Sequence, residues 1–294
     1  DGNPLATPLS LRPRGGKPLD PTALPSGASG HILLLAHGLC MNDLQWRRAG
    51  HDHGEALAAT LGCTPVYLRY NSGLHTWENG RALAEALESV VACWPVPVER
   101  LDLLGHSMGG LVLRSALQYG SQAGHAWRAR VGHTVFLGTP HHGAPLERAG
   151  NWADVLIGSN PWSRPFARLA QLRSSGITDL RFGHVQEGDG QGRARFRAGR
   201  DARLALPLPG DVHCHAVAAT LAGARSPRAQ RMLGDGLVTP PSALGQHTDP
   251  ARRLHFAAAD TLVVHGAGHL DLLSDARVTR QLRQWLRTAP RPAP

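Results

Sequence analysis

The sequence predicts an α/β fold built on a mostly parallel sheet with helices on both faces. Short apolar runs bounded by glycine or proline recur along the chain, as expected for strands that are buried on both faces of such a sheet. Longer segments with apolar residues at helical spacing lie between these runs. The two kinds of segment alternate from residue 31 onward, which is typical of parallel strands connected by helices.

The individual elements follow from the same patterns. Residues 32–36 form a continuous apolar run that ends at a His-Gly pair, and residues 80–94 carry an apolar stripe that stops at Pro95. Strands are expected at residues 32–36, 66–70, 100–104, 131–137, 213–221 and 262–265. Helices are expected at residues 54–61, 80–94, 108–119 and 277–286.

The chain is long enough for one large domain, since 42% of its 294 residues are hydrophobic and 18% are charged. Residues 1–30 are rich in Pro, Gly and Ser, and we expect an irregular N-terminal arm there, followed by a single domain at residues 31–294. The connection from Pro140 to His213 is too long for a simple crossover. It predicts a helical cap inserted at about residues 144–200.

Large apolar side chains within the expected cap are candidates for contact with a substrate. They are Trp152, Leu156, Trp162 and Phe166. Ligand pockets are mostly apolar, so these side chains could line a substrate pocket, and they could equally form the core of the cap itself. Both interpretations stay open.

The formal charge of +9 comes almost wholly from arginine, because Lys17 is the only lysine. A basic total can signal binding to nucleic acid or to an anionic surface. The arginines are dispersed, with the densest patch at residues 193–203, and no nucleic-acid motif accompanies them. We therefore expect general surface charge and no nucleic-acid partner. No apolar run reaches the roughly 18 residues that a membrane span requires, so no transmembrane segment is expected.

The four cysteines, Cys40, Cys63, Cys93 and Cys214, have no CxxC or zinc-type spacing. Their even number permits two disulfides without requiring any. Cys93 and Cys214 lie in apolar contexts, where a buried free thiol is at least as good an interpretation. The numbering begins at Asp1 rather than Met, so the compartment is left open, with the cytoplasm slightly favoured over secretion.

Residues 105–109, Gly-His-Ser-Met-Gly, match the G-x-S-x-G motif of a nucleophile elbow, in which the serine sits on a tight turn from strand to helix. The neighbours two positions away must lack bulk, which explains the glycines. The motif is common by chance, but here a predicted strand runs into it and a predicted helix leaves it. We therefore predict Ser107 as the nucleophile of an α/β-hydrolase fold.

The segment His37-Gly38-Leu39, at the end of the first long strand, resembles the H-G-x segment of bacterial lipases and esterases. Acyl transfer needs two donors aimed at the developing oxyanion. One donor is the backbone N–H of the residue after the nucleophile, here Met108, and the resemblance places the second on Leu39. The alternative is an ordinary turn at the end of a strand.

The elbow fold orders its triad as Ser, then Asp or Glu, then His. Among 17 histidines, His269 is favoured because it lies in the loop after the last strand, whereas His265 belongs to the strand end. Asp235 lies between two glycines, in what we expect to be a flexible turn after the fifth strand. The D-G-L-V and later G-H-L-D segments resemble the lipase pattern, which implies that Asp235 and His269 are catalytic. The rivals Asp211 and Asp260 precede their strands and should lie at the opposite sheet edge.

Residues 138–143, Gly-Thr-Pro-His-His-Gly, resemble the T-P-H-x-G segment of lipase-like and inositol-deacylase-like hydrolases. Its two histidines could shape the site or line the hinge of the cap. Asp211, His213 and His215 alternate along a strand, and a structural role for them is favoured over a metal site.

Calcium is a further question that the resemblance raises. Asp271 occupies a position that is a calcium ligand in some of the bacterial lipases that the sequence resembles, but Asp275 stands where those relatives carry a glutamine. We expect no metal and no cofactor.

Together these segments predict hydrolysis of a carboxylic ester through an acyl-enzyme, with Ser107, Asp235 and His269 as the triad. The expected substrate is a small-molecule or lipid ester. A thioesterase or an amidase could use the same residues, because a fold does not fix a substrate. A non-catalytic binding module would have no chemical use for them. The oligomeric state and the acyl chain length stay open.

Overall fold

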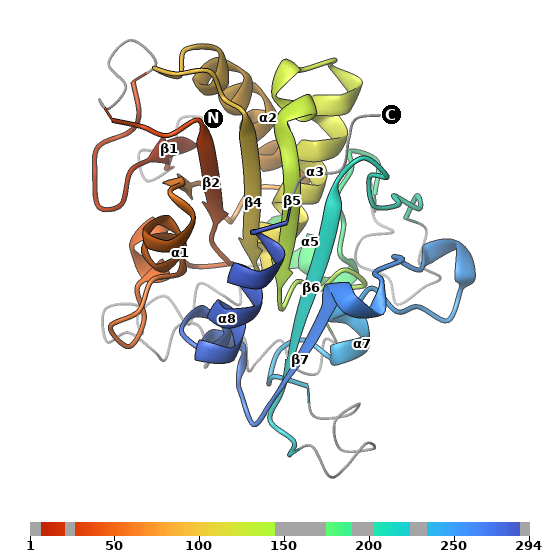
Figure 1. Cartoon of the computed structure of the whole chain (residues 1–294). Coiled ribbons are helices and arrows are strands. Elements are labelled where there is room, and N and C mark those ends of the chain that lie inside the picture. The colour runs from red at the N-terminus through yellow and green to blue at the C-terminus, as the bar shows by residue number, and fades with distance from the viewer. Residues whose placement is uncertain (1–6, 21–26, 145–174, 190–202, 224–233, 289–294) are drawn as a thin grey trace.

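The computed structural model describes residues 7–20, 27–144, 175–189, 203–223 and 234–288. A seven-stranded sheet with the order β1-β3-β2-β4-β5-β6-β7 runs through this part of the chain (Figure 1). The strands are β1 (Ser10–Arg12), β2 (His31–Ala36), β3 (Thr64–Arg69), β4 (Arg100–His106), β5 (Val131–Leu137), β6 (His213–Thr220) and β7 (Thr261–His265). All neighbouring pairs from β3 to β7 are parallel, which confirms the predicted sheet.

The first strand corrects the prediction of an irregular arm at residues 1–30. β1 pairs with β3 in the antiparallel direction, with Leu11 opposite Leu68, and both leucines are buried. A three-residue strand is too short to show a period of two in its sequence. Its existence depends on the edge of β3 that it covers, which is a tertiary feature.

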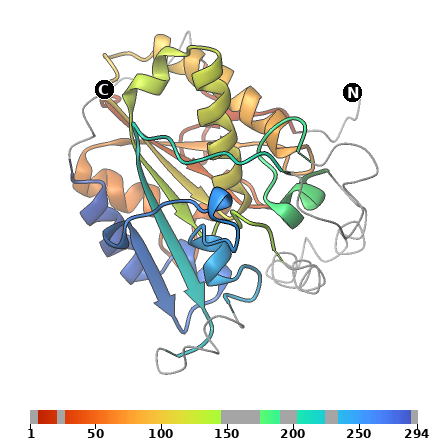
Figure 2. The same ribbon diagram turned by 90° about the vertical axis from the view of Figure 1, so that its right-hand side faces the viewer.

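Helices cover both faces of the sheet (Figures 1 and 2). The helices are α1 (His53–Leu61), α2 (Thr76–Ala92), α3 (Met108–Gln122), α5 (Ser175–Phe182), α7 (Pro240–Ala243) and α8 (Ala276–Trp285). α1 and α8 lie together on one face, and α2 and α3 lie together on the other. The four helices that the sequence predicted are α1, α2, α3 and α8, so the three-layer arrangement is confirmed.

Alternation along β2 divides the core between these layers. Leu33 and Leu35 belong to the hydrophobic cluster that includes α1 and α8, whereas Ile32, Leu34 and Ala36 belong to the cluster under α2 and α3. Successive side chains of a strand point to opposite faces, so a strand buried on both sides must be apolar throughout. This requirement explains the uninterrupted apolar run in the sequence.

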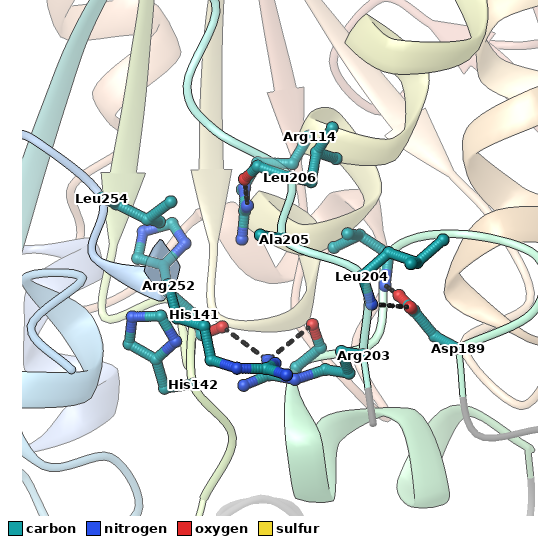
Figure 3. Close-up of a pocket in the computed structure, with 12 residues that line it drawn as sticks. Arg114, His141, His142, Asp189, Arg203, Leu204, Ala205, Leu206, Arg252 and Leu254 are labelled. Atoms are coloured by element: carbon teal, nitrogen blue, oxygen red, sulfur yellow. Dashed lines mark hydrogen bonds between the residues drawn. The ribbon is translucent and has the colours of Figure 1, made fainter. Parts of the chain in front are cut away.

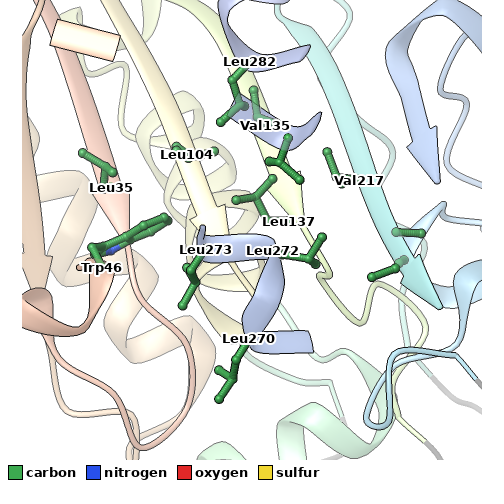
Figure 4. Packing of buried hydrophobic residues seen from close by; sticks show 14 of the residues in the cluster. Leu35, Trp46, Leu104, Val135, Leu137, Val217, Leu270, Leu272, Leu273 and Leu282 are labelled. Carbon is green, nitrogen blue, oxygen red and sulfur yellow. The ribbon is translucent and has the colours of Figure 1, made fainter. Parts of the chain in front are cut away.

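The hydrophobic cluster that contains Leu33 and Leu35 extends to the segment after β7, which carries His269. Figure 4 shows Leu270, Leu272 and Leu273, which follow β7, near Leu137 at the end of β5. Leu272 and Leu273 are almost completely buried. The loop after β7 is therefore held by the core, and not only by its own backbone.

The cysteines differ in how far their side chains are exposed to solvent. Cys63 is buried, and burial raises the pKa of its thiol to about 11. Cys93 is exposed, so a buried thiol there is the wrong interpretation; the residue follows the last turn of α2 as its C-cap. Cys214 is half-buried on β6. The four cysteines all lie in the described ranges, and none of them forms a disulfide.

Within the described ranges, every helix is too short or too polar to span a bilayer.

Candidate active site

Ser107 stands between β4 and α3 as the N-cap residue of the helix, with φ 54° and ψ −124°. Positive φ is uncommon for a residue with a side chain, and such strained backbones are typical of functional sites. The Ser107 N–H donates to the carbonyl of Leu137 at the end of β5, at 2.8 Å, which fixes the turn against the sheet. The predicted strand–turn–helix context of the serine is therefore present.

The glycines of the motif are required by close approach of the backbone. A Cβ atom on Gly105 would lie 2.7 Å from Cα of Gly110, and one on Gly109 would lie 2.2 Å from the carbonyl oxygen of Ala36. Both distances are well below van der Waals contact, so no other residue fits at either position. The sharp turn lets α3 begin directly against the end of β2.

His269 and Asp235 form a buried pair at the same sheet edge. Nδ1 of His269 lies 2.7 Å from Oδ2 of Asp235, and the His269 N–H donates to the Asp235 carbonyl at 3.0 Å. The two residues are 1% and 3% exposed. A buried carboxylate beside a histidine can fix the histidine's tautomer and stabilise its cation.

The turn that carries Asp235 is not the flexible one that its flanking glycines suggested. Oδ1 of Asp235 accepts hydrogen bonds from the backbone N–H groups of Leu237 at 2.9 Å and Val238 at 2.7 Å. Gly234 and Gly236 have φ values of 54° and 98°, so the glycines permit a tight turn. The carboxylate is consequently held in one orientation, with Oδ2 directed to His269.

His269 is packed against the elbow through the neighbour of the serine. The His106 ring lies 4.7 Å from the His269 ring, and Nε2 of His106 lies 3.1 Å from the His269 carbonyl oxygen, to which it can only donate. Burial lowers the pKa of His106 well below its usual value, and repulsion from His269 is a second, smaller cause, so the ring is neutral. A Cβ atom on Gly138, after β5, would lie 3.1 Å from two ring atoms of His269.

The predicted oxyanion loop lies directly against the serine. A Cβ atom on Gly38 would be 3.1 Å from Cβ of Ser107. Leu39 and Met108 are buried, and their backbone N–H groups have no hydrogen-bond acceptor among the described residues. Two backbone donors beside a nucleophile are what stabilisation of an oxyanion requires.

A histidine and a tyrosine hold this loop in place. The His37 ring stacks on Tyr70 at 4.3 Å, its Nδ1 donates to the Gly38 carbonyl at 2.8 Å, and the Tyr70 hydroxyl donates to the His37 carbonyl at 2.8 Å. Burial lowers the pKa of His37 to about 4, so the ring is neutral at pH 7. The role of Tyr70 could not be predicted from the sequence, because a partner 33 residues away leaves no local signal.

The rival acids have other partners at the opposite edge. Asp211 lies 3.1 Å from the Arg128 guanidinium, and Asp260 lies 3.0 Å from Nδ1 of His215. His265 ends β7 and is half-buried. Both acids precede their strands, and the candidate site lies at the carboxyl ends of those strands. Asp211 and Asp260 therefore lie at the opposite edge of the sheet, as predicted.

The remaining predicted site residues fall into two groups. Trp152, Leu156, Trp162 and Phe166 lie outside the described residues, as does most of the expected cap. Asp271 accepts a hydrogen bond from the Gly268 N–H, and Asp275 caps α8. Within the described ranges, no group of three or more His, Cys, Asp or Glu side chains is arranged to hold a metal ion.

α5, within the expected cap insertion, lies close to the elbow. A Cβ atom on Gly176 would lie 2.0 Å from the Ser72 carbonyl oxygen and 3.1 Å from Cε of Met108. Oδ2 of Asp179 accepts hydrogen bonds from Thr76 N–H at 2.9 Å and from Nδ1 of His75 at 3.0 Å. This attachment of α5 to the start of α2 joins residues about 100 positions apart, so no local pattern in the sequence predicts it.

Solved structures of the same fold include several lipases. The mature form of the Bacillus licheniformis lipase BlEst2 aligns with a TM-score of 0.55 and 17% identity, over 95% of this chain and 98% of that one. Aspergillus fumigatus lipase B aligns with a TM-score of 0.53 and 13% identity, over 92% of this chain and 57% of that one. At such identities the likeness establishes the fold. The chain has the α/β-hydrolase fold, as bacterial lipases and esterases do.

No curated protein matches the sequence. A family model, however, matches residues 12–175, which is more than half of the chain. The matched segment contains the loop at His37 and the elbow at Ser107, and it ends before Asp235 and His269. The chain therefore belongs to the family described as a domain of unknown function, DUF7379.

Proposed function

We propose that the chain is a serine hydrolase that cleaves carboxylic esters, with Ser107 as nucleophile, His269 as base and Asp235 as the residue that orients it. One observation carries the proposal: the strained elbow of Ser107 and the buried His269–Asp235 pair meet at one sheet edge. Oγ of Ser107 is buried and has no hydrogen-bond partner among the described residues.

The hydrogen bond to Asp235 decides which nitrogen of His269 can act as the base. The ionised carboxylate only accepts, so Nδ1 carries the proton and Nε2 presents its lone pair. In the proposed reaction Nε2 takes the proton of the Ser107 hydroxyl while Oγ attacks the ester carbonyl. The N–H groups of Leu39 and Met108 donate to the resulting oxyanion.

Collapse of the tetrahedral intermediate expels the alcohol, which takes the proton from Nε2 of His269, and leaves an acyl group on Ser107. Water then repeats the two steps and releases the acid. Esters are favoured over other acyl compounds because the similar structures with TM-scores above 0.5 are described as lipases. That support comes from the fold alone.

An active-site probe tests the nucleophile. A fluorophosphonate should label the folded wild-type protein at Ser107, and Ser107→Ala should remove both labelling and ester hydrolysis, with a fall in kcat of at least about 10³-fold. Ser115→Ala is the matched control, because Ser115 lies on the same helix and its Oγ is also buried without a partner in the described part of the chain. Hydrolysis that survives in Ser107→Ala would contradict the proposal.

The substrate class needs a separate measurement. Matched ester, thioester and amide substrates with one acyl group should be compared by kcat/KM, with the ester expected to be turned over best. A preference for the thioester or the amide would retain the nucleophile and change the assigned class. A folded protein that ignores all three and the probe would be a binding module.

A further inference from the structure

A pocket next to α3 is lined by three arginines and two histidines together with apolar side chains (Figure 3). It lies between α3, the loop after β5 and the segment at residues 203–206, and it is partly open to solvent. Its polar lining consists of Arg114, His141, His142, Asp189, Arg203 and Arg252. Nothing in the proposed ester chemistry uses these side chains.

Arg114 is the buried cation of the pocket. It is 7% exposed, and its Nη2 donates to the Leu206 carbonyl at 2.6 Å. Its Nε is buried and has no hydrogen-bond partner among the described residues. Burying a charged group with an unused donor is costly, so a guanidinium in this state calls for an acceptor that is not part of the described chain.

Arg203 approaches the pocket from the side opposite Arg114 (Figure 3). Its Nη1 donates to the carbonyls of His141 at 3.1 Å and Gly183 at 3.3 Å. These contacts fix the guanidinium between the loop after β5 and the end of α5. Two arginines are thereby held rigidly around one space, which is the arrangement that recognises carboxylate or phosphate oxygens.

His141 contributes a second buried polar group without a partner. The side chain is fully buried, and neither ring nitrogen has a hydrogen-bond partner among the described residues. The ring packs edge-on against Phe136 at 4.8 Å, which orients it. A neutral imidazole carries one N–H donor, so His141 can add a donor to the two guanidinium groups.

One carboxylate belongs to the described lining of the pocket. This is Asp189, whose oxygens accept the backbone N–H groups of Val185, Gln186 and Leu204. Its negative charge raises the pKa of Arg114 and so opposes the repulsion between Arg114 and Arg203.

Burial and repulsion from Arg203 lower the pKa of Arg114 to about 10. Burial and then repulsion from Arg114 and His142 lower the pKa of His141 well below its usual value. A bound anion would relieve both repulsions.

We propose that this pocket binds an oxyanion, a carboxylate or a phosphate, through Arg114, Arg203 and His141. The anion is either part of the substrate or a free ligand. Arg114 lies seven residues after Ser107 on α3, which corresponds to about 10 Å along the helix axis. This separation suits an acyl or alcohol part that ends in an acidic group several bonds from the ester. The substrate-borne form rests on the proposed function, and the free-ligand form does not.

Inorganic phosphate tests the free ligand on the full chain. Phosphate should raise the midpoint of thermal unfolding of the wild-type protein relative to chloride at the same ionic strength, with binding measured by calorimetry. Arg203→Gln, at a half-buried position, should weaken phosphate binding by roughly tenfold or more, because a charged hydrogen bond is lost. Arg114→Gln should do the same. Arg280→Gln removes an exposed charge of α8 and should leave phosphate binding unchanged.

A pair of esters tests the substrate-borne anion. The p-nitrophenyl monoester of suberic acid ends in a carboxylate at the far end of its acyl chain, whereas p-nitrophenyl heptanoate is a neutral analogue. The ratio of their kcat/KM values should favour the acidic ester in the wild-type protein and in Arg280→Gln, and the preference should fall at least about tenfold in Arg203→Gln. Circular dichroism checks that each variant is folded.

The two measurements separate the possible outcomes. Phosphate binding without an ester preference supports a free ligand, and an ester preference without phosphate binding supports a substrate-borne anion. Absence of both, or binding that is equal in wild type, Arg114→Gln and Arg203→Gln, overturns the proposal. A protein that hydrolyses neither ester but binds phosphate through Arg203 would refute the proposed function and retain the anion site.

Discussion

Asp235 divides its two carboxylate oxygens between two tasks: Oδ2 lies 2.7 Å from Nδ1 of His269, and Oδ1 accepts two backbone N–H groups of its own turn. The turn therefore holds the carboxylate while the carboxylate holds the imidazole. An acid that was merely near the histidine would leave the tautomer undecided. The two oxygens make separate predictions possible for orientation and for stability.

Replacement of Asp235 by Asn should lower kcat by about 10⁴-fold with little loss of stability. The amide oxygen can keep the bonds to Leu237 and Val238, but the amide NH₂ then faces Nδ1 and donates to it. His269 is forced into the tautomer that presents a proton to Ser107. Steady-state kinetics and thermal unfolding should be measured together. A near-normal kcat in a folded Asp235→Asn protein would show that another acid acts.

Replacement of Gly109 by Ala should destabilise the fold by about 3 kcal/mol, because the new methyl would lie 2.2 Å from the Ala36 carbonyl oxygen. The expected fall in Tm is about 5 °C. Gly223→Ala is the control, since a Cβ atom there has no neighbour within 4 Å. Equal Tm values for the two variants would mean that the elbow can relax.

The stability of the fold should fall as the pH drops from about 6.5 to about 4. Burial lowers the pKa of His37 and His53 to about 4, against 6.5 in an unfolded chain. The unfolded state therefore binds more protons in this range, and the free energy of unfolding decreases with falling pH by about 1.4 kcal/mol per unit for each such histidine.

Urea unfolding at pH 7.5, 6, 5 and 4.5 measures this slope. His53→Gln should reduce it, because the amide keeps a donor for the Leu272 carbonyl and does not titrate. His255→Gln, at an exposed position, should leave the slope unchanged. A wild-type free energy of unfolding that is constant over this range would contradict the prediction.

Replacement of Asp179 by Ala should loosen α5 locally. The change removes the acceptor for Thr76 N–H and for Nδ1 of His75, and each lost bond to a charged acceptor costs about 1.5–3 kcal/mol. Amide hydrogen exchange across residues 175–182 should be at least about tenfold faster. Asp211→Ala, which removes an exposed carboxylate, should leave that exchange unchanged.

The sequence by itself determined the layers and the order of the elements. Strands buried on both faces must be apolar throughout, and helices must carry an apolar stripe. Both patterns can therefore be recognised within a short stretch of the sequence. The elbow at Ser107 could also be predicted from its five-residue motif, although the need for Gly109 comes from its contact with the end of β2. The pairing of Asp235 with His269 remains a prediction in its catalytic role, and the order of the motifs pointed to it.

Only the tertiary structure decided what depends on residues far apart in the chain. β1 exists because the edge of β3 needs a partner, and the Asp235 turn is rigid because its carboxylate is tied on both sides. Tyr70 supports the loop at His37 across 33 residues. Arg114, Arg203 and His141 are dispersed in the sequence and become one pocket only when α3, the loop after β5 and the segment at residue 203 pack together. A charge pattern in the sequence reports a total, whereas a binding site depends on where the fold brings the charges together.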